Sequence, residues 1–129
     1  MLHIENARVD SQSVGTIEGQ ANTGTFLIKP LMRGDSMALL EVSVKAGAAS
    51  SIHAHSHESV IYVVRGRLKT TIGNETFVLG PGDVCRHPRA VGHLVEALED
   101  TVFVEVKSPA IDSRQVFGEA PSSDKPKGV

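Results

Sequence analysis

The sequence predicts an all-β fold of the sandwich or barrel type, and three observations support this prediction. Strand-like runs recur about every 8–12 residues, which is the spacing typical of all-β domains. Turn residues separate the runs, and glycine is frequent, with 12 residues in a chain of 129. No segment keeps the apolar repeat of a long amphipathic helix. Short strands joined by tight turns therefore account for most of the chain.

The expected strands follow one another through the middle of the chain. They are residues 25–28, 37–44, 59–64, 68–72, 75–79, 84–87, 92–98 and 101–106. These runs are rich in β-branched residues or alternate apolar with polar side chains, as half-buried strands do. Gly73-Asn74 is typical of a hairpin turn between two of them. A short helical turn is expected near residues 111–117.

The length of the chain suits a single domain. We expect an N-terminal arm over residues 1–22, a barrel over residues 23–117 and a tail over residues 118–129. The tail is rich in Pro, Ser, Lys and Gly, so it buries too little apolar surface to offset the entropy lost on ordering. The sequence therefore predicts a disordered C-terminal tail.

The composition argues against several classes of partner. Lys and Arg number 13 and Asp and Glu number 15, which gives a formal net charge of −2. Without a basic stripe, neither nucleic acid nor a membrane surface is an expected partner. The N-terminus lacks the apolar core of a signal peptide, and the single Cys85 cannot form an intramolecular disulfide. We therefore expect a cytoplasmic protein in which Cys85 is a small buried hydrophobe.

Five of the six histidines are concentrated in one part of the sequence. They are His53, His55, His57, His87 and His93. On a strand, His53 and His55 would point to the same face, and His93 on a later strand could complete a metal site if the sheet curls. Imidazole suits Fe, Zn, Cu and Ni rather than Ca or Mg. An isolated His-x-His pair on an exposed strand is more often just part of the polar surface, so the surrounding residues decide between a surface pair and a metal site.

Those surrounding residues resemble the two cupin motifs. Residues 47–66 read Gly, five residues, His-x-His, three residues, Ser59, six residues, Gly, and the first motif has this spacing with Glu in place of the serine. Residues 82–97 resemble the second motif, with Ala90 in place of Gly and Ala97 in place of Asn. The two stretches occur in the right order with a hairpin between them. The chain is therefore similar to a small single-domain cupin.

The resemblance implies a double-stranded β-helix, the jelly-roll barrel of the cupins. It also implies that His53, His55 and His93 hold one divalent transition metal ion, which would be Fe, Zn, Mn or Ni. Cupins of this size usually pair, so the resemblance further implies a homodimer.

The resemblance leaves the fourth ligand open, because the family glutamate matches Ser59. One alternative is a three-histidine site with open positions, as in the three-histidine dioxygenase cupins. In a second alternative, Glu58 or His57 completes the coordination shell of the metal. In a third alternative, the site binds ligands without a metal. From their positions in the sequence, Glu58 is expected to be exposed to solvent and His57 to lie outside the coordination shell of the metal. His87 is either a buried hydrogen-bonded histidine or a substrate contact.

One carboxylate, Glu105, lies in the apolar run of residues 101–106. If Phe103 faces the interior, Glu105 does too, and it could act as a general base near the metal. The alternative points three valines of this run inward and leaves Glu105 in water. The pattern alone slightly favours this second arrangement.

The C-terminal strand region also resembles the pectin-degradation-type cupins, which linearise unsaturated uronate sugars. In that subgroup an acidic residue matching Glu105 lies beside the metal, although it is Asp rather than Glu. This sequence also has Lys107 and Ile111 where the subgroup has an aromatic residue and an arginine. The resemblance keeps Glu105 as the candidate catalytic residue but weakens the transfer of the sugar chemistry.

The functional prediction is a metal-dependent enzyme that acts on a small, anionic organic molecule. The reaction would be dioxygenation or a metal-assisted isomerisation or proton transfer. The alternative is a non-catalytic binding or sensor module that uses the same cavity for a small-molecule ligand.

Overall fold

The structure is a computed structural model that describes residues 1–120, and it confirms the predicted all-β fold. The described residues form ten strands and two short 3-10 helices. The strands are β1 (Gln12–Ile17), β2 (Gln20–Arg33), β3 (Ala38–Val44), β4 (Glu58–Arg65), β5 (Leu68–Ile72), β6 (Glu75–Leu79), β7 (Val84–His87), β8 (His93–Ala97), β9 (Thr101–Ser108) and β10 (Phe117–Glu119). The 3-10 helices are η1 (Asn6–Arg8) and η2 (Ser113–Gln115).

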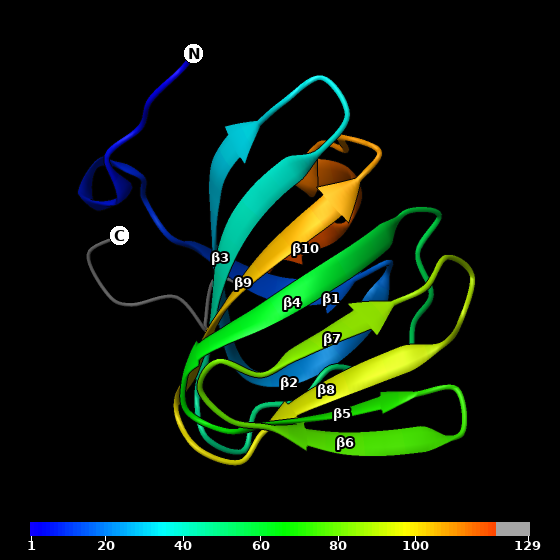
Figure 1. The fold of residues 1–129 in the computed structure, drawn as a ribbon. Coiled ribbons are helices and arrows are strands. Elements are labelled where there is room, and N and C mark those ends of the chain that lie inside the picture. The colour runs from blue at the N-terminus through cyan, green and yellow to red at the C-terminus, as the bar shows by residue number, and fades with distance from the viewer. Residues whose placement is uncertain (121–129) are drawn as a thin grey trace.

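The strands are arranged in two antiparallel sheets (Figure 1). The larger sheet has the strand order β10-β1-β2-β3-β9-β4-β7, and the smaller has the order β6-β5-β8. Buried residues of both sheets form one hydrophobic core. This arrangement is the predicted jelly-roll barrel.

The predicted strands are present, and the differences lie toward the two ends of the described chain. The run predicted at residues 25–28 is part of the much longer β2. This strand continues through Pro30, and its pairing with β3 shifts register between Pro30 and Met32. Proline has no N–H to donate, so an irregularity there lets the strand continue. The helical turn expected near residues 111–117 is η2.

The large sheet extends beyond the range predicted for the barrel, residues 23–117. β1 pairs with both β2 and β10, which places residues 12–17 and 117–119 inside the sheet. Val14 and Ile17 of β1 are buried in the core, so this segment gains apolar contacts that its mixed polar sequence did not suggest. Residues 121–129 of the predicted tail lie outside the described residues.

The glycine that ends the first motif is required by the local backbone. Gly66 has a φ of +92°, a conformation that side chains disfavour. A Cβ at this position would collide with the carbonyl oxygen of Asp100 and with Thr101. Gly66 thereby allows β4 to turn into β5 directly beneath β9.

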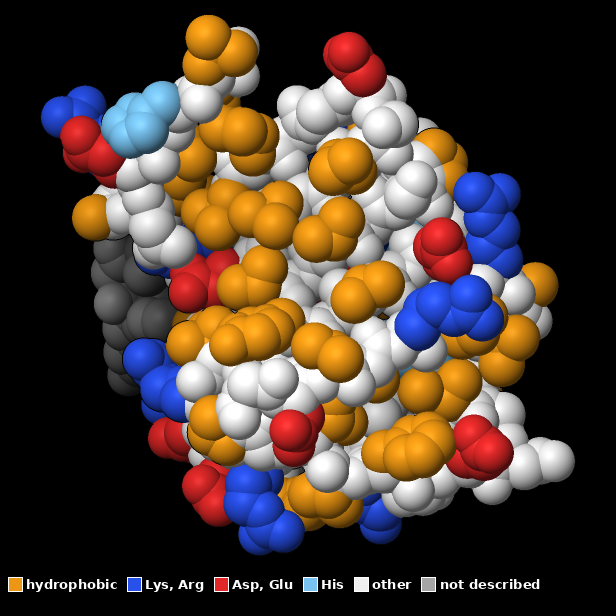
Figure 2. Space-filling view, viewed as in Figure 1, with side chains coloured by type: hydrophobic (Ala, Val, Ile, Leu, Met, Phe, Trp, Pro, Cys, Tyr) orange, Lys and Arg blue, Asp and Glu red, His pale blue; other side chains and the backbone are white. Residues whose placement is uncertain are grey.

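The strands β4 and β9 each have one face inside the barrel and one outside. Ser59, Ile61 and Val63 of β4 are buried, whereas Val60, Tyr62 and Val64 are about half exposed. Figure 2 shows hydrophobic side chains spread over the outer face in front of β3, β9 and β4.

Within residues 1–120, no helix is long and apolar enough to cross a membrane.

Candidate metal centre

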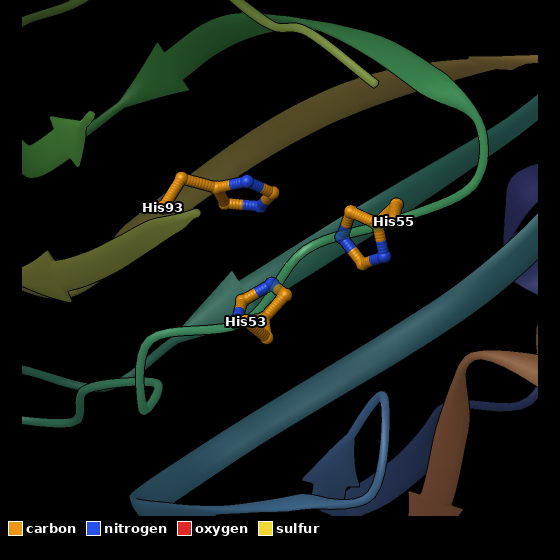
Figure 3. A group of neighbouring side chains, drawn as sticks. All are labelled: His53, His55 and His93. Carbon is orange, nitrogen blue, oxygen red and sulfur yellow. The ribbon is translucent and has the colours of Figure 1, made fainter. Parts of the chain in front are cut away.

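The three predicted metal ligands lie together inside the barrel (Figure 3). His53 and His55 belong to the segment between β3 and β4, and His93 begins β8. The main chains of His53 and His93 form a bridge, with N–H to carbonyl distances of 3.0 and 2.9 Å in the two directions. The prediction placed His53 and His55 on a regular strand. The segment is instead a loop, and this bridge fixes it against β8.

The three imidazole rings converge closely. The ring centroids of His53 and His93 are 4.3 Å apart, and His55 lies 4.8 Å from His53 and 4.9 Å from His93. One nitrogen from each ring lies within 4.8 Å of the others, and all three side chains are buried. Ligands of one ion have nitrogen–metal distances of about 2.0–2.1 Å, so small ring rotations would bring these atoms around a common ion.

The second nitrogen of each ring has a partner that fixes its tautomer. Nδ1 of His53 lies 2.7 Å from the Ser51 carbonyl oxygen, and Nδ1 of His93 lies 3.4 Å from that of Val91. Nδ1 of His55 lies 2.7 Å from Oε1 of Glu18. Each Nδ1–H group therefore donates a hydrogen bond to an oxygen, which leaves Nε2 as the ligand atom.

The rings are also neutral, as metal ligands must be. Burial lowers the pKa of His53 and lowers that of His93 to about 3. Burial, followed by the nearby Lys107 charge, lowers the pKa of His55 strongly. Three neutral imidazoles with oriented Nδ1–H groups are a donor set that fits a divalent transition metal. Oxygen-preferring ions such as Ca²⁺ or Mg²⁺ do not suit it.

The residues suggested for a fourth ligand lie in different surroundings. Ser59 points inward, and its buried hydroxyl has no hydrogen-bond partner of normal geometry among residues 1–120. Glu58 is partly exposed, and its carboxylate lies 3.9 Å from the guanidinium of Arg86. His57 is buried, and its Nε2 lies 3.0 Å from the Lys107 ammonium.

Glu105 is buried in the barrel, with 6% of its surface exposed, so the solvent-facing arrangement that the pattern slightly favoured is wrong. Its Oε2 accepts a hydrogen bond from Nζ of Lys107 at 3.1 Å. Burial is the largest single influence and raises the pKa of Glu105, but the Lys107 charge, His87 and the Ser59 and Lys107 side chains together outweigh it, so the net pKa is lowered. Glu105 is therefore an ionised carboxylate inside the protein.

His87 is confirmed as a buried, hydrogen-bonded histidine, whereas a contact with substrate stays a prediction. Its Nε2 lies 3.0 Å from Oγ1 of Thr70, and Thr70 donates to the carbonyl oxygen of Leu94 at 3.1 Å. Its ring stacks on His93 at a centroid distance of 3.9 Å. Burial lowers its pKa to about 4. His87 is therefore a buried, hydrogen-bonded histidine that also supports one of the three clustered rings.

Two residues of this centre were not expected from the sequence. Glu18 lies in the turn between β1 and β2 and reaches His55, although the two residues are far apart in the chain. Lys107 is 1% exposed, and lysines are rarely so buried. Lys107 lies two residues after Glu105 on the same strand, and side chains at i and i+2 share a face. The sequence could therefore have indicated that Lys107 faces the interior whenever Glu105 does.

The clustered histidines line a small cavity at the polar end of the barrel. Glu105, Lys107 and His87 also line it, and apolar side chains such as Ile61 and Phe103 complete its walls. About 30 Å³ is open to the centres of water-sized molecules. This space holds about two such molecules, or a group of similar size.

The comparison with known proteins decides the family. The family model of the cupin domain, Cupin_2, matches residues 40–106, which include the three clustered histidines and Glu105. The chain belongs to the cupin family. Because the match contains both motifs in full, the departures at Ser59, Ala90 and Ala97 are variations within a cupin rather than evidence of another fold.

This cupin has similar proteins in sequence and in structure. It is 32% identical over 93 residues to the uncharacterised protein SCO3923 of Streptomyces coelicolor. The aligned residues cover 71% of this chain and 87% of that protein. An RmlC-like cupin from Shewanella frigidimarina superposes with a TM-score of 0.76 at 20% identity, over 88% of this chain and 95% of the other. KdgF from Halomonas sp. has a TM-score of 0.75 at 26% identity, over 88% and 97% of the two chains.

Proposed function

We propose that this cupin is a metal-dependent enzyme that moves a proton on a small anionic organic molecule. The observation that carries the proposal is that an ionised buried carboxylate, Glu105, lines the same cavity as three neutral imidazoles. His53, His55 and His93 would hold the ion, which would be Fe, Zn, Mn or Ni. Such an ion acts as a Lewis acid that polarises an oxygen of the substrate.

The charges of the site support an anionic substrate. The three imidazoles contribute no charge, and position 59 has a serine where the cupin motif has a carboxylate. The charges of Glu105 and Lys107 compensate each other at a distance of 3.1 Å. A divalent cation held by this donor set would keep most of its charge, which favours binding of an anion.

Glu105 is the group that would transfer the proton. Its carboxylate is ionised and can accept a proton from a carbon or a hydroxyl group placed in the cavity. Burial excludes most water from the carboxylate, so the proton it accepts can return to the same molecule. An isomerisation needs this sequence of removal and return.

Dioxygenation is the second candidate, and the all-histidine donor set favours it. With Fe(II), this set is similar to that of the three-histidine dioxygenase cupins. A binding or sensor module remains the alternative without catalysis, because it would use the same cavity and the same charges.

A proton-exchange experiment tests the proposal. The untagged protein is loaded with Zn, Mn, Ni or Fe(II) and incubated in D₂O with short 2-oxo and 2-hydroxy acids, and deuterium incorporation is followed by NMR. We expect incorporation that is lost in Glu105→Gln and retained in the control Glu58→Gln, because Glu58 faces Arg86 outside the cavity. Absence of exchange with every acid and every metal would contradict the proposal.

The same samples separate the rival functions. Oxygen consumption that depends on Fe(II) would favour dioxygenation. Ligand-dependent thermal stabilisation without any turnover would favour a binding module. The homodimer implied by the family resemblance stays a prediction, which sedimentation velocity of the untagged protein would test.

A further inference from the structure

We infer that Lys107 recognises the anionic group of the substrate and thereby determines the specificity of this cupin for small carboxylates. The inference rests on the proposed function, because it concerns the substrate of the same cavity. It adds a binding residue that neither cupin motif contains, since Lys107 lies beyond both of them.

Lys107 is a buried residue that lines the cavity. Its side chain is 1% exposed, and its Nζ lies 5.4 Å from the centre of the Phe117 ring. The cavity that it lines is the one lined by His53, His55 and His93. A ligand in this cavity would therefore lie between the imidazoles and a fixed positive charge.

The strand register explains why a lysine is accommodated here. Ser59 of β4 pairs with Lys107 of β9 on one side and with His87 of β7 on the other. These three buried side chains form one row across the inner face of the sheet. A glutamate at position 59, as in the first cupin motif, would face Lys107 directly and pair with it. Serine instead leaves room and makes no hydrogen bond to the ammonium.

The ammonium group retains the capacity to bind a ligand. A lysine ammonium has three N–H donors. Contacts with Glu105 at 3.1 Å and with Nε2 of His57 at 3.0 Å account for two of them within the described part of the chain. The third donor belongs to a group that lines the cavity, and a carboxylate oxygen placed there would accept it.

Lys107 also decides the sign of the charge that the cavity can accept. Without its ammonium, an incoming carboxylate would meet the ionised Glu105 in a nearly dry site. Like charges at such short distances repel strongly when water is excluded. With Lys107 present, the Glu105 charge is compensated and the entering anion gains a charge-assisted hydrogen bond.

The size of the cavity limits the group that can enter it. The open space is about 30 Å³, enough for about two water-sized groups, which matches a carboxylate. A short-chain 2-oxo or 2-hydroxy acid has a carboxylate of this size next to an oxygen that a metal can polarise. Lys107 would bind the carboxylate of such an acid, and Glu105 would lie beside its carbon chain.

Ligand titration of the cobalt-loaded protein tests this inference without relying on turnover. Acetate and its neutral isostere acetamide are titrated into wild type, Lys107→Met and the control Lys69→Met while the visible absorption of Co(II) is followed. Lys69 on β5 does not line the cavity. Loss of one charged hydrogen bond predicts acetate binding that is about 10- to 100-fold weaker in Lys107→Met, with acetamide binding unchanged and Lys69→Met equal to wild type.

A second pair of variants covers the case in which Lys107→Met does not fold, because that change leaves Glu105 unpaired. Glu105→Gln, whose amide oxygen can still accept the hydrogen bond from Lys107, is compared with Glu105→Gln/Lys107→Met, in which neither buried charge remains. The double variant should again bind acetate about 10- to 100-fold more weakly than the single one.

The cobalt content of each protein distinguishes failure of the inference on Lys107 from failure of the proposed function. Equal acetate affinity with and without Lys107, at equal cobalt content, would overturn the role of Lys107 and leave the proposed function intact. Failure of the wild-type protein to bind cobalt would overturn both.

Discussion

The interior of the barrel has two halves of opposite chemistry that the same strands form. Toward one end, Val63 of β4 pairs with Phe103 of β9 within an apolar core that includes Leu68, and Phe103 also lines the cavity. At the other end, the same two strands contribute Ser59, Glu105 and Lys107. Both halves are buried, but the first is stabilised by apolar contact and the second by the pairing of polar groups.

This difference shows what each half requires. An apolar core tolerates a smaller side chain with a graded loss of stability, because neighbouring side chains partly refill the space. A buried charge has no such graded response, since removal of its partner leaves it in a medium of low dielectric. The polar half should therefore be the more sensitive to single substitutions, while the apolar half should leave the metal centre unaffected when it is altered.

Breaking the Glu105–Lys107 pair should give the largest effect. Glu105→Leu leaves the Lys107 ammonium buried and without its carboxylate, so we expect the free energy of unfolding to fall by about 3–5 kcal/mol. Denaturant unfolding measures it. The double variant Glu105→Leu/Lys107→Met should recover most of the loss. A single variant as stable as wild type would contradict the burial of this pair.

Altering the apolar half should destabilise the protein without affecting the metal. Leu68 is fully buried in the core, and Leu68→Ala should lower the free energy of unfolding by about 2–5 kcal/mol. The metal content of the folded variant should equal that of wild type. Loss of the ion from a folded Leu68→Ala protein would show that the two halves are coupled.

Acid should act on the polar half through its buried histidines. His87 has its pKa lowered from 6.5 to about 4 by burial, so between these pH values the unfolded chain takes up a proton that the folded protein does not. The free energy of unfolding should therefore fall as the pH falls through this window, by about 1.4 kcal/mol per pH unit for each such histidine. Urea unfolding at several pH values should give a shallower slope for His87→Asn. Equal slopes would contradict the burial of a neutral His87.

The smallest effect should come from the Ser59 hydroxyl, whose contact with Glu105 does not reach normal hydrogen-bond geometry. Ser59 Oγ is buried without a hydrogen bond of normal geometry in the described structure, so Ser59→Ala should change stability by less than about 0.5 kcal/mol. Thr70→Val is the matched comparison. It removes a donor to the Leu94 carbonyl and should destabilise the protein by about 0.5–1.5 kcal/mol. Calorimetry would measure both, and a loss at Ser59 as large as that at Thr70 would contradict this account.

The sequence predicted the apolar half better than the polar half. Alternation along the strands and the motif glycines were sufficient for the fold, and the motif spacing correctly predicted that His53, His55 and His93 lie close together. These features are local or have a fixed spacing along the chain. They can therefore be read without knowledge of how the sheet curls.

Which side chains lie in the polar half depends on which face of β9 points into the barrel. Composition does not reveal this. Either face of β9 could have pointed inward, and hydrophobicity alone favoured the face with Val104. The pairing of Phe103 with Val42 and Val63 places the opposite face inside, and with it Glu105 and Lys107. Glu18 was missed for a similar reason, since its contact with His55 joins segments distant in the sequence.

Elemental analysis of protein purified without an affinity tag tests the central claim most directly. The account predicts about one transition-metal ion per chain in wild type and in His87→Asn, and almost none in His93→Ala, whose fold would be checked by circular dichroism. Wild-type protein without a bound ion, or a folded His93→Ala that retains the full content, would contradict the claim that these three imidazoles form a metal centre.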